Sequence, residues 1–317
     1  LRLTVFKTHD SARLRNRGVL AAPLHRRSHM VELTVLNTMA ASDFTQALDR
    51  HLEWGLRVLD LKDLVFGKRI VDLTAEEALQ AQALIRDRGL SVYCFSTQLF
   101  EPEVELGEEV FRRDHLGKVA HTIEIARILQ PKMIRLLAAQ TSRRAEIDDS
   151  RAYLRAEHPW ALPLYVEAID MIHEAGFHTT IENETGQCIL SNPTEILDFF
   201  GELGRADRVS FTWDVQNLWE LGTFPSVAAY GAFRHLVRYY HLKGGQHNET
   251  CRDLCWRSSL EDASWPVVEI TREVIADGAT PVICMNGSHG EKKEGYDYTD
   301  IVQRDMDFIR NAIPEIA

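Results

Sequence analysis

Two acidic residues and one histidine stand at the ends of hydrophobic runs in the second half of the chain. Glu182 ends the run HTTIE, Asp214 ends RVSFTWD, and His241 ends VRYYH. If these runs are neighbouring parallel strands, their carboxyl ends meet at one edge and the three side chains face one pocket. Two carboxylates and one imidazole suit Mn²⁺, Mg²⁺, Co²⁺ or Zn²⁺. We therefore expect one divalent metal ion, with Mn²⁺ preferred.

Other polar and aromatic residues near these strand ends are candidates for binding substrate. Lys243 is expected either to neutralise a substrate oxygen or phosphate or to pair with a strand-end acid. Glu184 is an alternative to Glu182 as the acidic ligand. For the remaining candidates the other interpretation is an ion pair or plain packing, because aromatic residues at such positions are often part of the core. The predicted substrate-binding residues are Arg135, Trp213, Asn217 and Trp256.

The elements that must position these residues alternate along the chain from Val31 onward. Short β-rich runs are followed by stretches whose apolar residues recur at three- and four-residue steps, as on an amphipathic helix. Thr74 and Glu77 match a capping box, which predicts the start of one such helix. Strands are predicted at residues 32–37, 57–62, 91–95, 133–138, 178–182, 208–214, 237–241 and 280–285.

Helical stretches are predicted between these strands and after the last one, where Thr299 is expected to cap the closing helix. Eight strands alternating with helices are typical of an α/β protein with the (β/α)8 TIM barrel fold. A doubly wound open sheet is the alternative. That fold usually carries a glycine-rich phosphate loop after the first strand, whereas Thr-Met-Ala-Ala-Ser follows Asn37. The barrel is therefore favoured.

Composition narrows the classes of partner. The formal net charge is -11, which argues against nucleic acid because tracking phosphates needs clustered Lys and Arg. No apolar run approaches the roughly 18 residues of a membrane span. The five cysteines lack zinc-ribbon spacing and are expected to be free thiols in a reducing compartment. We expect a cytoplasmic protein.

Residues 1–30 differ from the rest of the chain in being basic, and no apolar core of a secretory signal is recognisable in them. They are interpreted as an N-terminal appendage, either non-native or in contact with other subunits. Residues 31–317 are then one catalytic barrel domain. A homo-oligomer is expected, and a separate partner subunit stays open.

Four segments resemble the xylose isomerase-like barrel superfamily of sugar-phosphate isomerases and epimerases. They are TIENE, FTWDVQN, YYHLKG and GATPVICMNGSHGE. The resemblance implies a metal held by Glu182, Asp214 and His241 and by an acidic residue after the eighth strand. Asn286 stands at that fourth position and is expected to ligate through its amide oxygen. Many relatives also carry His at the place of Asn217 and Asp at the place of Gly244.

The resemblance implies proton abstraction next to a carbonyl, through an enediolate, on a sugar-like small molecule. Family epimerases resemble two-base enzymes, and Asn286 cannot take a proton. The predicted catalytic residues are therefore Glu182, His289 and Lys243. A metal-dependent lyase or dehydratase acting on keto-sugars, inososes or 3-keto-C-glycosides is the runner-up. Less favoured are an abasic-site endonuclease of the same superfamily, which needs three zinc ions, and a metabolite-binding barrel without turnover.

Overall fold

Eight parallel strands form one sheet that nearly closes on itself. The computed structural model describes residues 30–250, 252–287 and 299–317. Hydrogen bonds join the strands in the order β1-β10-β7-β6-β5-β4-β3-β2. A parallel bridge between Leu36 and Asp60 links the two ends of that order. The strands are β1 (Glu32–Val35), β2 (Val58–Leu61), β3 (Ser91–Ser96), β4 (Met133–Leu137), β5 (His178–Glu182), β6 (Val209–Asp214), β7 (Val237–Leu242) and β10 (Val282–Met285). The predicted (β/α)8 TIM barrel is confirmed.

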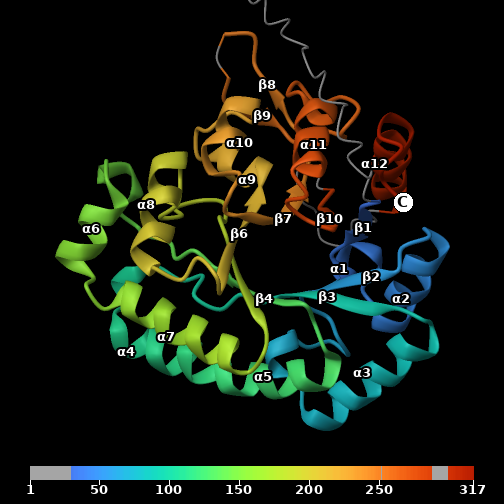
Figure 1. Cartoon of the computed structure of the whole chain (residues 1–317), viewed down its shortest axis with the longest axis horizontal. Helices are drawn as coiled ribbons and strands as arrows, with labels where there is room; N and C mark the ends of the chain where they lie inside the picture. Colours follow the sequence, from blue (N-terminus) through green and yellow to red (C-terminus); the bar gives the residue numbers. More distant parts are fainter. Residues whose placement is uncertain (1–29, 251, 288–298) are drawn as a thin grey trace, which may run out of the picture.

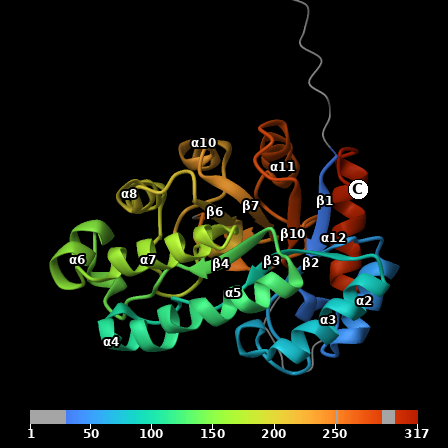
Figure 2. The ribbon, with the colours of Figure 1, turned by 60° about the horizontal axis from the view of Figure 1, so that its bottom comes forward.

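Helices surround the strands in chain order, so that the last helix lies near the first ones (Figure 1). In the turned view α3 and α5 lie side by side across the front of the molecule (Figure 2). The main helices are α2 (Phe44–Glu53), α3 (Ala75–Asp87), α5 (Gly117–Leu129), α7 (Ala161–Glu174), α8 (Pro193–Leu203), α10 (Val227–Phe233), α11 (Val267–Ala276) and α12 (Thr299–Ala312).

Shorter elements decorate the loops. The polar segment 141–157 contains a helix, and the helix expected from His115 begins earlier, at Glu108, and passes through a π-helical turn. A two-stranded hairpin follows β7. These elements are α1 (Asn37–Ala40), α4 (Glu108–Phe111), α6 (Ser150–Glu157), α9 (Val215–Glu220), β8 (Gln246–His247), β9 (Leu254–Trp256), the turns η1 (Ile70–Asp72), η2 (Val104–Leu106) and η4 (Arg144–Glu146), and the π turn η3 (Arg112–Leu116).

Local capping signals mark the starts of α3 and α8. The Thr74 side chain accepts a hydrogen bond from the Glu77 amide, and the Glu77 carboxylate accepts one from the Thr74 amide at 2.8 Å. This capping box satisfies backbone N–H groups that the helix itself leaves unpaired. Asn192 caps α8 by accepting a hydrogen bond from the Glu195 amide at 3.1 Å, directly before a proline at the first helical position.

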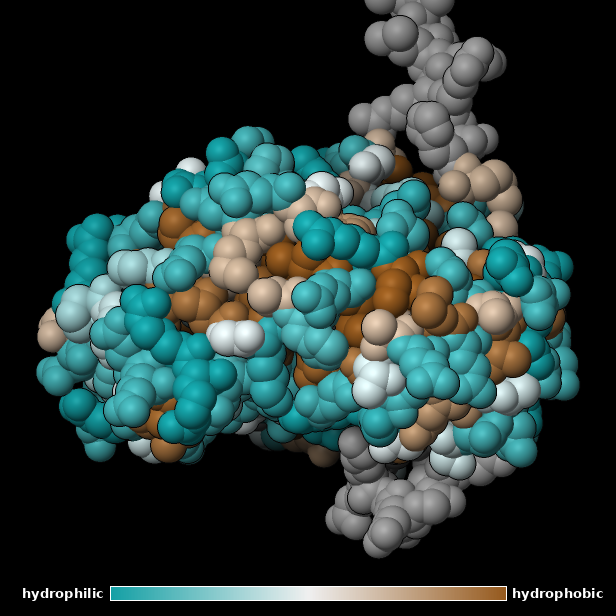
Figure 3. All heavy atoms as spheres, turned by 90° about the horizontal axis from the view of Figure 1, so that it is seen from below, coloured by the Kyte–Doolittle hydropathy of each residue, from teal (hydrophilic) through white to brown (hydrophobic). Residues whose placement is uncertain are grey.

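Two separate apolar clusters make up the core. The larger lies between the strands and the surrounding helices. The smaller lies inside the barrel and packs aliphatic, aromatic and sulfur side chains from the strands against one another. Its buried members are Leu36, Val58, Tyr93, Cys94, Met133, Tyr239, Val282 and Cys284. Seen from below, the outer face is mostly hydrophilic, with hydrophobic residues showing between hydrophilic ones (Figure 3). No helix in the described ranges is long and apolar enough to cross a membrane.

Gly244 lies two residues beyond β7, where the backbone of residues 258–259 packs directly against it and leaves no room for a side chain. A methyl group on this buried residue would lie 2.1 Å from the Ser258 carbonyl oxygen and 2.4 Å from that of Ser259. No side chain fits there unless the 258–259 segment moves.

We expect Gly244→Ala to lower the free energy of unfolding by about 2–3 kcal/mol, the upper range for overpacking a filled site. Gly201→Ala in α8 is the matched control, because nothing lies within 4 Å of the added methyl group. Relief of glycine's backbone entropy should make this control more stable by about 0.5–1 kcal/mol. Urea unfolding of both variants checks the expectation, and a Gly244→Ala protein as stable as wild type would contradict it.

Candidate metal centre at the barrel mouth

Glu182, Asp214 and His241 meet at the carboxyl ends of three adjacent strands. Glu182 is the last residue of β5, Asp214 is the last of β6, and His241 pairs in register with Asp214 from β7. One oxygen of each acid and one ring nitrogen all lie within 4.8 Å of one another. All three side chains are buried. The structure thus brings together the three residues that were predicted from their positions at the ends of the hydrophobic runs.

The imidazole of His241 faces both carboxylates. Its Nδ1 atom lies 2.9 Å from Glu182 Oε1 and 3.7 Å from Asp214 Oδ2. Neither ring nitrogen makes a well-aligned hydrogen bond to any residue in the described ranges. Buried polar atoms normally have such partners. An imidazole nitrogen and two carboxylate oxygens converging on one point fit the donor set of a divalent cation.

Two cations balance the two carboxylates. Arg135 forms an ion pair with the second oxygen of Glu182 and donates to the Thr97 carbonyl oxygen at 3.1 Å. The Nζ atom of Lys243 lies 2.7 Å from Asp214 Oδ2. Of the two roles that the sequence left open for Arg135 and Lys243, the ion pair is the one present here.

Asp214 and Asn217 also organise the start of α9. Asp214 Oδ1 accepts hydrogen bonds from the backbone amides of Gln216 and Asn217 at 3.1 and 3.0 Å. The Asn217 side chain donates to Glu184 Oε1 at 3.0 Å and accepts from Lys243 at 3.0 Å. Asn217 therefore orients the residues around the three ligands from a buried position. Only Oδ2 of Asp214 is left to face Lys243 and His241.

Burial and charge act in opposite directions on these groups. Burial raises the pKa of Glu182, but Arg135 and His241 outweigh it and hold that pKa far below its usual range. Burial lowers the pKa of His241, but the Glu182 and Asp214 carboxylates outweigh it and raise the pKa to about 9. Without a metal, His241 is therefore protonated at neutral pH.

The other predicted site residues have different surroundings. Asn286 directly follows β10 and is buried, and its backbone amide donates to the Leu242 carbonyl oxygen at 3.1 Å. Trp213 is only 1% exposed and stacks on Tyr230, with ring centroids 5.5 Å apart. Neighbouring strand residues point to opposite faces, so Trp213 lies in the helix-facing core while Asp214 faces the barrel interior. Of the two interpretations of Trp213, substrate binding or plain packing, the packing is the one present here.

Two further predicted residues lie away from this buried cluster or outside the described ranges. Trp256 is 54% exposed on β9, in the segment between β7 and α11. Its contact with substrate stays a prediction. His289 lies outside the described residues, as does the side chain of Thr299.

Asp60 is a buried acid that the sequence analysis did not predict, because only residues at strand ends were considered there. It lies in β2 with its Oδ2 atom 3.8 Å from His241 Nε2, and it accepts a hydrogen bond from the Tyr239 hydroxyl at 2.8 Å. Burial raises the pKa of Asp60 even though His241 and Arg135 lower it. A charged residue within the otherwise apolar run VLDL was the available signal.

Glu101 is a further partly buried acid, in the loop that follows β3. Phe100, which precedes it, has a left-handed φ of 71°, and the Phe100 amide donates to His115 Nδ1 at 3.0 Å. Burial lowers the pKa of His115 to about 4, so the ring stays neutral and accepts this bond. Burial, and next the charge of Glu184, raise the pKa of Glu101. Strained backbone of this kind clusters at functional sites.

The comparisons with known proteins agree with this architecture. Residues 48–311 match the family described as the xylose isomerase-like TIM barrel. The chain therefore belongs to that family. No match was found among curated proteins.

Solved structures show the same fold at low sequence identity. A xylose isomerase-like TIM barrel protein from Mycobacterium smegmatis, in complex with magnesium, is 15% identical with a TM-score of 0.65, covering 90% of this chain and 96% of its own. The probable 3-DHS dehydratase AsbF from Bacillus anthracis is 14% identical with a TM-score of 0.66, covering 89% and 99%. The D-psicose 3-epimerase from Clostridium cellulolyticum H10, solved with D-tagatose, is 10% identical with a TM-score of 0.63, covering 89% and 99%.

We expect Glu182→Gln to lower the pKa of His241 from about 9 by more than one unit in the metal-free protein. The reason is that a neutral amide removes the largest charge that stabilises the imidazolium. NMR titration of the His241 ring measures the change. Asp170→Asn is the control, because this acid pairs with Arg205 and Arg208 instead. An unchanged His241 pKa in Glu182→Gln would contradict the charge balance described above.

Proposed function

We propose that the chain is a divalent-metal-dependent isomerase or epimerase that acts on a sugar or sugar derivative. The observation that carries this proposal is the convergence of Glu182, Asp214 and His241, whose ligand atoms lie within 4.8 Å of one another. Family membership and the magnesium complex of a structural neighbour support it. The epimerase among the neighbours supports a sugar-like substrate.

The three residues would hold the ion, with Asn286 as the proposed fourth ligand. Such an ion would supply Lewis-acid polarisation of a substrate carbonyl and would offset negative charge on the substrate oxygens. Arg135 keeps Glu182 ionised and oriented through their ion pair. Lys243 lies within reach of Asp214 and is the cation available to a substrate oxygen.

The charges around Glu182 also indicate which residues act as the acid or base in proton transfer. Arg135 and His241 make Glu182 a weak base, and the Asn286 amide cannot accept a proton as a base. An efficient acid–base group has a pKa near the working pH. Glu101 is half-buried beside the charge of Glu184, and both factors shift its pKa upward. We propose that Glu101 takes part in proton transfer, together with the predicted groups Glu182, Lys243 and His289.

A metal-dependent dehydratase or other lyase is the second candidate. The observation that favours it is the amide at Asn286, because a site with fewer carboxylates is less suited to symmetrical two-base epimerisation. The dehydratase among the structural neighbours is consistent with this second candidate. A lyase releases water or another leaving group after the carbon-bound proton is lost, so the products of the two candidates differ.

Metal content tests the centre directly. We expect about one Mn, Co, Zn or Mg per chain in wild type by elemental mass spectrometry. Loss of one ligand should weaken binding more than the ~10- to 100-fold that an outer partner contributes, so Asp214→Ala should retain none. Asn286→Glu, which restores a carboxylate, should bind at least as tightly as wild type. A wild-type chain that neither contains nor takes up metal would overturn the proposal.

Solvent isotope exchange separates the two candidates and tests Glu101. In D2O with Mn²⁺ and a panel of keto sugars, an isomerase or epimerase should place deuterium in the recovered sugar, while a lyase should form an unsaturated product. Chelation should abolish either reaction. Glu101→Gln should slow exchange by about 10²- to 10⁴-fold, the range for loss of a general acid or base, without changing metal affinity. Glu105→Gln, in the same loop, should react at the wild-type rate, and equal rates in both variants would exclude Glu101.

A further inference from the structure

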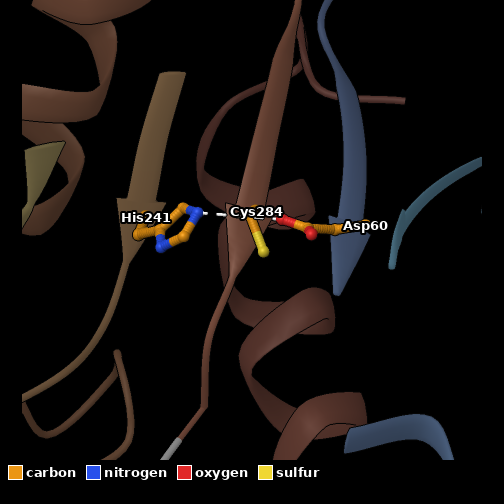
Figure 4. A group of neighbouring side chains, drawn as sticks. All are labelled: Asp60, His241 and Cys284. Carbon is orange, nitrogen blue, oxygen red and sulfur yellow. Dashed lines mark ion pairs between the residues drawn. The ribbon is translucent and has the colours of Figure 1, made fainter. Parts of the chain in front are cut away.

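Asp60, His241 and Cys284 point toward one another inside the barrel from β2, β7 and β10 (Figure 4). All three are 0% exposed. Asp60 Oδ2 faces His241 Nε2 at 3.8 Å and is held by the Tyr239 hydroxyl at 2.8 Å. The second oxygen of Asp60, Oδ1, makes no hydrogen bond to a residue in the described ranges. A buried carboxylate with spare acceptor capacity therefore lies directly beside the ring.

The two ring nitrogens of His241 face different acids. Nδ1 lies 2.9 Å from Glu182 Oε1, whereas Nε2 lies nearest to Asp60. An ion shared with Glu182 and Asp214 would therefore use Nδ1, and the neutral ring would then carry its proton on Nε2. That N–H points to the side of the ring where Asp60 lies. Metal-binding histidines almost always donate their other N–H to a carboxylate, carbonyl or water.

We propose that Asp60 is a positioning residue whose carboxylate accepts the Nε2–H of His241 and holds Nδ1 toward Glu182 and Asp214. This inference rests on the metal centre of the proposed function. In this arrangement Asp60 would act through His241 and would not be a metal ligand. Tyr239 fixes the Asp60 carboxylate from the adjacent side, so the histidine, the acid and the hydroxyl form one buried chain.

The thiol of Cys284 offers a competing arrangement. Asp60, His241 and Cys284 also have ligand atoms within 4.8 Å of one another. An ion bound there would use Nε2 of His241 and would make Asp60 a direct ligand instead of a positioning residue. Thiolate ligands select softer metals than carboxylates do, and a thiolate bound to cobalt produces a charge-transfer band in the near ultraviolet. Cobalt therefore distinguishes the two arrangements.

The experiment is a Co²⁺ titration of the full chain by calorimetry and absorption spectroscopy. We expect Asp60→Asn to bind Co²⁺ ~10- to 100-fold more weakly than wild type. Cys284→Ser should keep the wild-type affinity, and no thiolate band should appear. Equal affinities for wild type and Asp60→Asn would overturn the inference while leaving the proposed function intact. A thiolate band that disappears in Cys284→Ser would overturn it in favour of the inner arrangement.

If the variants fail to fold, a measurement on the wild-type protein alone still tests the proposed role of Asp60. In the zinc-loaded, ¹⁵N-labelled protein, His241 should show a proton on Nε2 that exchanges slowly with solvent and a metal-shifted Nδ1 resonance. A proton on Nδ1 would overturn the inference even if zinc binds tightly. Absence of binding for both Co²⁺ and Zn²⁺ would overturn the proposed function first and this inference with it.

Discussion

The arrangement of the site depends on one constraint. The buried carboxylates at the carboxyl end of the barrel must be neutralised by nearby positive charge. Glu182 and Asp214 are at most 1% exposed, and a buried carboxylate without a partner costs several kcal/mol. Arg135 and Lys243 supply the partners. The imidazole of His241 lies between the same acids and holds a proton to about pH 9. A divalent ion that binds here must displace this proton and compete with Lys243 for Asp214, so metal binding should strengthen as pH rises toward that value.

The rest of the fold buries these charged side chains and fixes their positions relative to one another. Below them, the small apolar cluster inside the barrel fills the space between the strands. Around them, side chains alternate between the interior and the helix-facing core, which is why Trp213 packs outward while its neighbour Asp214 faces the other acids. Gly244 lets the 258–259 segment cross close to the end of β7. Strand geometry and loop packing therefore hold Glu182, Asp214 and His241 in place.

The sequence differs from the pattern that the resemblance implies in the charge of residue 286 more than in the shape of the barrel. Asn286 directly follows β10, where the resemblance implies a carboxylate, and a neutral amide there adds no negative charge. In the described residues Arg135 and Lys243 already neutralise Glu182 and Asp214. These two ion pairs leave the buried cluster with little excess negative charge.

The amino-acid sequence by itself determined the order of strands and helices and the three ligand candidates, because periodicity, caps and strand ends are local properties. Glu182, Asp214 and His241 were predictable since each lies at or one residue before the end of its own strand, and the carboxyl ends of the strands of such a barrel meet at one face. Only the tertiary structure decided the partners. Asp60 reaches His241 across the barrel, and no local pattern encodes how far a curved sheet brings β2 toward β7. The ion pairs of Arg135 and Lys243 likewise depend on strand register, because a shift of one residue would turn each side chain to the opposite face.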